Sequence, residues 1–247
     1  RPEELPESLE TALGSFIAGA SLLLTHSPED APVSMLVHAT QSVIIQSDYL
    51  TLIKNIIETW RNNAREASSI SDLPNEINTE KQRLVAVGAP DLDEANFLEA
   101  TRYVLSEVTL WLVNSESEQD SVNWRVAPVH ILVGGNKLDR GFTIEGLTVT
   151  YMNRPTSPQV DTMEQRARAF GYRKDLLPYC QFFATRRTSN LLRDVVFTEY
   201  DLRAQLQDHV EDGGTISSWA KEIGLLLPPD TRPTRPNVVK HLSTSGK

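Results

Sequence analysis

Short apolar runs alternate with longer segments of helical periodicity along most of the chain. The apolar runs have the length and continuity of strands buried on both faces of a sheet, and they lie at residues 33–39, 107–113, 129–133, 147–152 and 178–185. The segments with apolar residues at helical spacing lie at residues 5–25, 42–65, 92–106 and 190–210, with a short one at 217–223. LVAVGAP, at residues 84–90, fits either a helix end or a short strand. This alternation predicts a mainly parallel sheet with helices on both faces.

In a parallel sheet with right-handed crossovers, the loops that follow the strands meet at one edge. Residues 38–42, Asn114, residues 134–143 and residues 153–154 follow four of the predicted strands. We therefore expect them to share one rim of the sheet.

The first predicted helix is apolar enough to raise the question of a signal peptide or a membrane span. Its apolar run, residues 9–24, is preceded by Glu3, Glu4 and Glu7 instead of basic residues, and it contains polar residues and glycines. Both features favour a core helix and a chain without a membrane segment. The single cysteine, Cys180, allows no internal disulfide and fits a reducing cytoplasm. The chain starts at Arg1, which suggests a piece of a longer protein.

The formal net charge of -9 argues against a protein that holds nucleic acid by bulk attraction. Residues 151–203 differ from the rest, because they contain nine Lys or Arg and six Asp or Glu, a net charge of +3. An anionic ligand is therefore expected in that region, and a wholly basic DNA-binding surface is not.

The sequence GGNKLDRGFT, at residues 134–143, follows a predicted strand. Its glycines allow close backbone approach, and Asn136, Lys137 and Arg140 could reach phosphates. The alternative is a tight turn with solvated charges. The loop is neither a dinucleotide-binding fingerprint nor a Walker A loop, and no Walker A pattern occurs in the chain.

The sequence DTMEQRARAFGYR, at residues 161–173, predicts a short helix capped by Asp161 and Glu164. It carries Arg166 and Arg168, with Arg173 just beyond. These arginines could neutralise a transferring phosphate, or they could belong to a solvated, salt-bridged helix.

Metal-dependent and hydrolase chemistry lack their usual patterns. The five histidines are dispersed, and no pair has metal-ligand spacing. His38, at a strand end, could touch a ligand or be a core histidine. The chain contains no E-x-K arrangement of a nuclease and no G-x-S-x-G elbow. We expect no metal site.

Two stretches together resemble a known family. KLDRGFTIEGLTVTYMNRPTSPQVDTMEQRARAFGYR resembles motifs five and six of a superfamily-two helicase in order and approximate spacing. The closer resemblance is to the Z1 domain, which is joined to such helicase modules in bacterial restriction systems and is often labelled an endonuclease. The openings LPESLETAL and SMLVHAT fit the same family.

The resemblance implies an α/β fold: a RecA-like three-layer domain with a mainly parallel sheet and helical additions at both ends. Residues 1–32 would be a helical lead-in, residues 33–211 the second RecA-like lobe, and residues 212–247 a C-terminal helix and a proline-rich tail.

The resemblance also assigns residue roles. It makes Arg168 the arginine finger with Arg173 supporting it, although their separation of five positions differs from the common helicase spacing of three. The residues implied in cofactor binding are Gly141, Thr143, Glu145 and Gln165. Thr143 stands where many helicases carry aspartate. The residues implied in nucleic-acid binding are His38, Thr40, Asn136, Lys137 and Arg140.

The implied activity is that of a motor half. ATP with magnesium would be held mainly by a first lobe upstream in the same polypeptide, and the partners would be that lobe, DNA and a nuclease subunit. The open alternatives are a nuclease domain and an inactive scaffold for a restriction complex.

Overall fold

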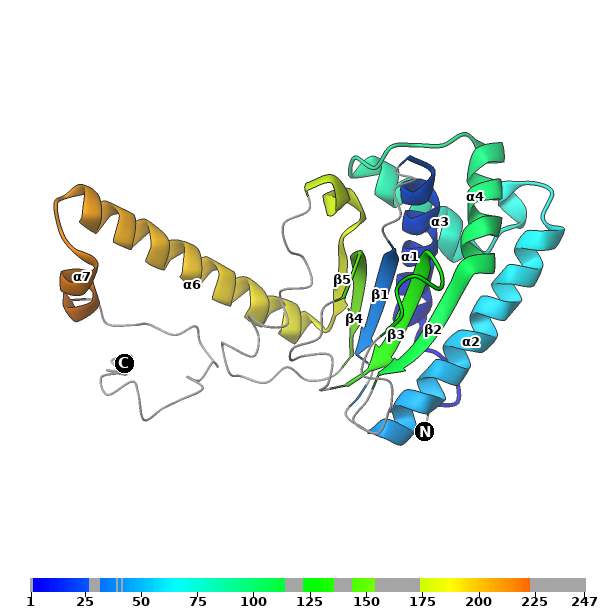
Figure 1. Cartoon of the computed structure of the whole chain (residues 1–247), viewed down its shortest axis with the longest axis horizontal. Helices are drawn as coiled ribbons and strands as arrows, with labels where there is room; N and C mark the ends of the chain where they lie inside the picture. The colour runs from blue at the N-terminus through cyan, green and yellow to red at the C-terminus, as the bar shows by residue number, and fades with distance from the viewer. Residues whose placement is uncertain are drawn as a thin grey trace. The chain divides into compact units, whose positions relative to one another are not determined.

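The computed structural model describes residues 2–26, 32–38, 40, 42–113, 122–135, 144–153 and 174–222 (Figure 1). The described strands are β1 (Val33–His38), β2 (Val108–Val113), β3 (Val129–Gly134), β4 (Leu147–Met152) and β5 (Gln181–Ala184). The described helices are α1 (Glu7–His26), α2 (Val43–Glu66), α3 (Asn75–Ala86), α4 (Glu94–Glu107), α6 (Arg186–Glu211) and α7 (Ile216–Glu222), with 3₁₀ turns η1 (Ile70–Asp72) and η4 (Lys174–Tyr179).

The described residues form two compact units. The first contains everything through Ala184, and the second begins at Thr185 and contains α6 and α7. This division differs from the expected boundaries in two ways. The first helix belongs to the same unit as the sheet, and α6 lies outside that unit.

The first unit is built on a five-stranded sheet in the order β2-β3-β1-β4-β5, which reads from right to left in Figure 1. Every strand pair is parallel. All six residues of β1 and of β3 are buried, which explains why their sequences are continuous apolar runs instead of alternating ones. The predicted parallel sheet is confirmed, and the architecture is consistent with a RecA-like α/β fold.

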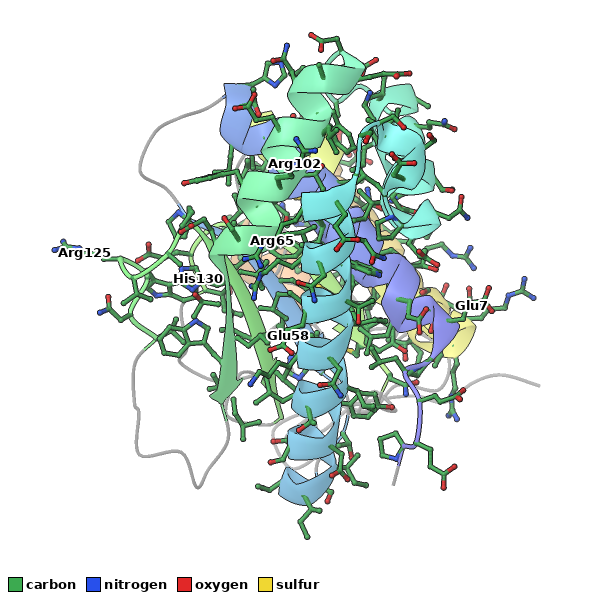
Figure 2. The ribbon with its side chains drawn as sticks, turned by 90° about the vertical axis from the view of Figure 1, so that its right-hand side faces the viewer. Glu7, Glu58, Arg65, Arg102, Arg125 and His130 are labelled. Carbon is green, nitrogen blue, oxygen red and sulfur yellow. The ribbon has the colours of Figure 1, made fainter. Side chains whose placement is uncertain are left out.

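Helices α1 to α4 pack on one face of this sheet. The inward side chains of Met35, Ile131 and Val149 on this face join one core cluster with residues from all four helices. Helices α2, α3 and α4 lie between β1 and β2 in the chain, whereas α1 precedes β1. Arg102 of α4 ties α4 to α2 by donating to the Ala64 carbonyl oxygen at 2.8 Å (Figure 2).

The opposite face of the sheet is covered, among described residues, by connecting segments. Leu36 and Leu132 cluster there with Val122, and Trp124 and Ile144 pack against them. The helices that the sequence predicts on this face stay a prediction.

Helix α1 is a core element. Leu13, Phe16 and Ile17 are fully buried, and α1 contacts β4 and β5 as well as α3 and α4. Among the described residues, α1 is the one helix long and apolar enough to cross a membrane, and 67% of its apolar window is buried inside the unit. That burial is typical of a core helix, as the sequence predicts.

The element boundaries differ slightly from the predicted ones because of capping. LVAVGAP begins as the end of α3, which stops at Ala86, and not as a strand. The carboxylate of Asp93 accepts from the Asn96 amide and starts α4 two residues later than predicted. The Thr185 hydroxyl accepts from the Thr188 amide and starts α6 four residues earlier than predicted.

Candidate functional site

The segments that follow β1, β3 and β4 meet at the carboxyl edge of the sheet. The parallel register pairs Val37 with Val133 and His38 with Met152, so the three strands end side by side. The Asn153 amide then donates to the His38 carbonyl oxygen at 3.1 Å. The described part of the predicted rim is therefore one continuous edge.

Three segments converge most closely around the side chain of Gln46, in the first turn of α2. Its Nε2 donates to the Thr40 carbonyl oxygen at 2.9 Å. A Cβ atom added to Gly135 would lie 2.5 Å from the same Nε2 and 3.3 Å from the Thr40 oxygen. The β1–α2 connection, the start of α2 and the residue after β3 are thus in contact.

Gln46 is 1% exposed, and its Oε1 has no hydrogen-bond partner among the described residues. Buried polar atoms are usually hydrogen-bonded, so this half-satisfied amide stands out. Sequence reasoning missed it. The available signal was the buried stripe of α2, which consists of Gln46, Tyr49, Ile53, Ile57, Trp60 and Ala64. Gln46 is the one residue of that stripe that is neither aliphatic nor aromatic, and it lies at the end of α2 nearest the predicted rim.

Thr40 is half-buried at this edge. Its Oγ1 accepts from the Ser42 amide at 3.2 Å, which leaves the hydroxyl hydrogen able to donate. Ser42 makes no side-chain cap for α2, and the first turn of α2 has no acidic residue. The local chemistry is that of hydrogen-bond donors without negative charge, which suits a phosphate oxygen.

His38 is 2% exposed. Its imidazole is therefore enclosed, and its backbone carbonyl holds Asn153. This placement matches the alternative of a core histidine better than a direct contact with nucleic acid.

Glu145 lies at the opposite edge of the sheet. It precedes β4, its carbonyl oxygen accepts from the Ser34 hydroxyl at 2.6 Å, and Ser34 lies near the start of β1. A six-residue strand spans about 20 Å, so Glu145 and Thr40 cannot hold the same small ligand. A residue just before a parallel strand lies away from the carboxyl edge. The predicted role of Glu145 in cofactor binding stays a prediction, because the other residues implied in that role lie outside the described residues.

The remaining predicted site residues lie outside the described residues. They are Asn136, Lys137, Arg140, Gly141, Thr143, Gln165, Arg168 and Arg173. Their assignments stay predictions.

His130 and Cys180 are titratable residues of the first unit whose surroundings favour a structural role. Trp111 Nε1 donates to His130 Nδ1 at 2.9 Å, so the His130 proton is on Nε2, which donates to the Ala127 carbonyl oxygen at 2.7 Å (Figure 2). Burial lowers the pKa of His130 and raises the pKa of the Cys180 thiol, which disfavours the thiolate. Within the described ranges, no group of three or more His, Cys, Asp or Glu residues could hold a metal ion.

Comparison with known proteins gives one match. A family model described as the Z1 domain matches residues 8–224. The matched range runs from the first turn of α1 to the end of α7, so it covers both units. No curated protein and no solved structure matches the chain.

Proposed function

Because the chain belongs to the Z1 domain family, we propose that it is the second motor lobe of an ATP-dependent DNA translocase in a bacterial restriction-type system. The observation that carries this proposal is the convergence of Thr40, Gln46 and Gly135 at the carboxyl edge of a parallel sheet. Ligands of open α/β sheets bind in the crevice outside the carboxyl ends of the strands.

In this proposal the edge holds one DNA strand by its phosphates. The Thr40 hydroxyl and the amides of the first turn of α2 would donate to phosphate oxygens, with Asn136, Lys137 and Arg140 adding charge. Such contacts position the strand and carry no sequence information, so binding would be largely independent of sequence.

ATP with magnesium would be held mainly by a first lobe upstream in the same polypeptide, because the chain has no Walker A loop. ATP would supply the free energy of phosphoryl transfer. Arg168, supported by Arg173, would stabilise the charge that develops on the γ-phosphate.

The test compares this chain with the polypeptide that contains the proposed first lobe. The chain alone should hydrolyse no ATP, whereas the longer polypeptide should hydrolyse it with stimulation by DNA. Arg168→Ala in the longer polypeptide should lower turnover about a thousandfold or more. Arg203→Ala is the matched control, because Arg203 is an exposed residue of α6 that pairs with Glu199.

Three results would count against this proposal. Unchanged turnover in Arg168→Ala would indicate a scaffold, and steady turnover by the chain alone would contradict the division of labour between two lobes. Plasmid nicking by the chain with magnesium or manganese would indicate a nuclease.

A further inference from the structure

The Gln46 amide lies between two loops that the proposed function assigns to DNA. It is 1% exposed and continues the apolar stripe of α2. Burying an amide in such a stripe costs free energy unless its polar atoms are hydrogen-bonded. Only the donor is satisfied among described residues, by the Thr40 carbonyl oxygen at 2.9 Å. Buried polar atoms are usually hydrogen-bonded, and the Gln46 Oε1 is one of the exceptions among the described residues.

Gly135 leaves room for the Gln46 amide because it has no side chain. The backbone of Gly135 is not in the left-handed region, because the described glycines with positive φ are Gly88, Gly146 and Gly213. Glycine is therefore not required there by the backbone conformation. What a side chain would meet is the Gln46 amide, with Nε2 2.5 Å from the position of an added Cβ. The space next to Gly135 is occupied by the side chain of Gln46.

We propose that Gln46 is a positioning residue of the DNA-binding edge. Its side chain is hydrogen-bonded to Thr40, after β1, and packs beside Gly135, after β3, so that these two residues keep one spacing against a bound strand. This inference rests on the proposed function. Gln46 itself is enclosed and acts through Thr40 and Gly135.

The first experiment measures DNA-stimulated ATP turnover of the polypeptide that contains both lobes. Gln46→Ala should raise the DNA concentration for half-maximal turnover about tenfold, which corresponds to the loss of one buried hydrogen bond. The rate at saturating DNA should stay within about twofold, because the residue does not touch ATP. Gln82→Ala is the control, since Gln82 is an exposed glutamine of α3.

The second experiment uses the contact between Gln46 and Gly135. Gly135→Ala should displace the amide from Thr40 and raise the same half-maximal DNA concentration about as much as Gln46→Ala. The double variant should be no worse than either single variant, because the smaller residue at position 46 leaves room for the new methyl group. Additive losses in the double variant would overturn the proposal.

The two hypotheses fail in different ways. If the wild-type polypeptide shows no DNA-stimulated turnover, the proposed function fails, and hydrogen exchange then tests the positioning role. Amides of residues 40–46 should exchange about tenfold faster in Gln46→Ala, and unchanged exchange would overturn that role. If wild-type turnover is DNA-stimulated and Gln46→Ala leaves the half-maximal DNA concentration unchanged, the positioning role fails and the proposed function stands.

Discussion

At the scale of single residues, the fold depends on a few positions where no side chain fits. Gly146 has φ of +61°, and an added Cβ would lie 1.5 Å from the Pro32 carbonyl oxygen. The Gly146 carbonyl oxygen also accepts from the Ser34 amide at 2.8 Å. The close approach of two backbone segments at the amino edge thus requires glycine.

Gly146→Ala should lower the free energy of unfolding by about 3 kcal/mol or more, because strain adds to a backbone clash. Gly88→Ala is the matched control: Gly88 also has positive φ, at +106°, but an added Cβ would meet nothing within 4 Å. It should cost only about 1 to 2 kcal/mol. Urea unfolding of the purified variants measures both, and equal losses would contradict the role of the Pro32 contact.

His130 should make stability depend on pH near neutrality. Burial lowers its pKa below the ordinary value of 6.5, although the Ala127 and Trp124 carbonyls and the Glu145 charge act in the opposite direction. As the pH falls, His130 therefore binds a proton in the unfolded chain before it does so in the folded chain. The contribution of neutral His130 to the free energy of unfolding is complete above pH 6.5 and is lost below it. Protonation would also turn Nδ1 into a donor facing the Trp111 donor.

The wild-type chain should lose up to about 1 kcal/mol of unfolding free energy through His130 between pH 7 and pH 5.5. His130→Asn, which cannot titrate, should show a flatter pH dependence in the same urea experiment. An unchanged slope in His130→Asn would refute the assignment.

At the scale of elements, the tightest described helix contact joins α1 and α3. An added Cβ on Gly14 would lie 2.7 Å from the Glu76 Cβ and 2.8 Å from its carbonyl carbon. The two helices approach this closely because Gly14 has no side chain. Gly19, on the same helix, has only ordinary contacts at 3.6 Å and 3.7 Å with Leu84 and Tyr179.

Gly14→Ala should destabilise the chain by about 2 kcal/mol, because the helices must move apart. Gly19→Ala should be neutral or stabilising by up to about 1 kcal/mol, since alanine favours the helix without a clash. Thermal unfolding followed by circular dichroism distinguishes the pair. Equal shifts of Tm in the two variants would show that the packing of α1 on α3 tolerates a methyl group.

At the scale of the whole molecule, the proposed function is that the carboxyl edge of the sheet binds the phosphates of one DNA strand. Thr40 is a described residue there with a hydroxyl hydrogen left to donate. Thr40→Val keeps the shape and removes the donor, whereas Thr40→Ser keeps the donor.

Thr40→Val should weaken DNA binding by the two-lobe polypeptide about fivefold, the worth of one hydrogen bond. The salt dependence should be unchanged, because a neutral hydroxyl releases no counterions. Thr40→Ser should bind as the wild type does in the same fluorescence anisotropy titrations. A loss that varied with DNA sequence would contradict backbone recognition.

Much of the fold could be predicted from the sequence because strands and helices have local signatures. The runs that became β1 and β3 are mostly apolar and do not alternate with polar residues, and all their residues are buried. Segment ends were less predictable, since the hydroxyl of Thr185 and the carboxylate of Asp93 decided where α6 and α4 begin. The candidate site was predictable only as an edge, because strand order brings its segments together.

The sequence by itself determined the strands, the main helices and the meeting of the loops after β1, β3 and β4, because periodicity and parallel topology fix which ends share an edge. Only the tertiary structure decided that Gln46 fills the space beside Gly135, that His38 is enclosed, and that Glu145 lies at the far edge. The first and last of these facts depend on contacts between residues about 90 or more positions apart along the chain. The second depends on how deeply the end of β1 is buried in the core. No local pattern of residues encodes such distances.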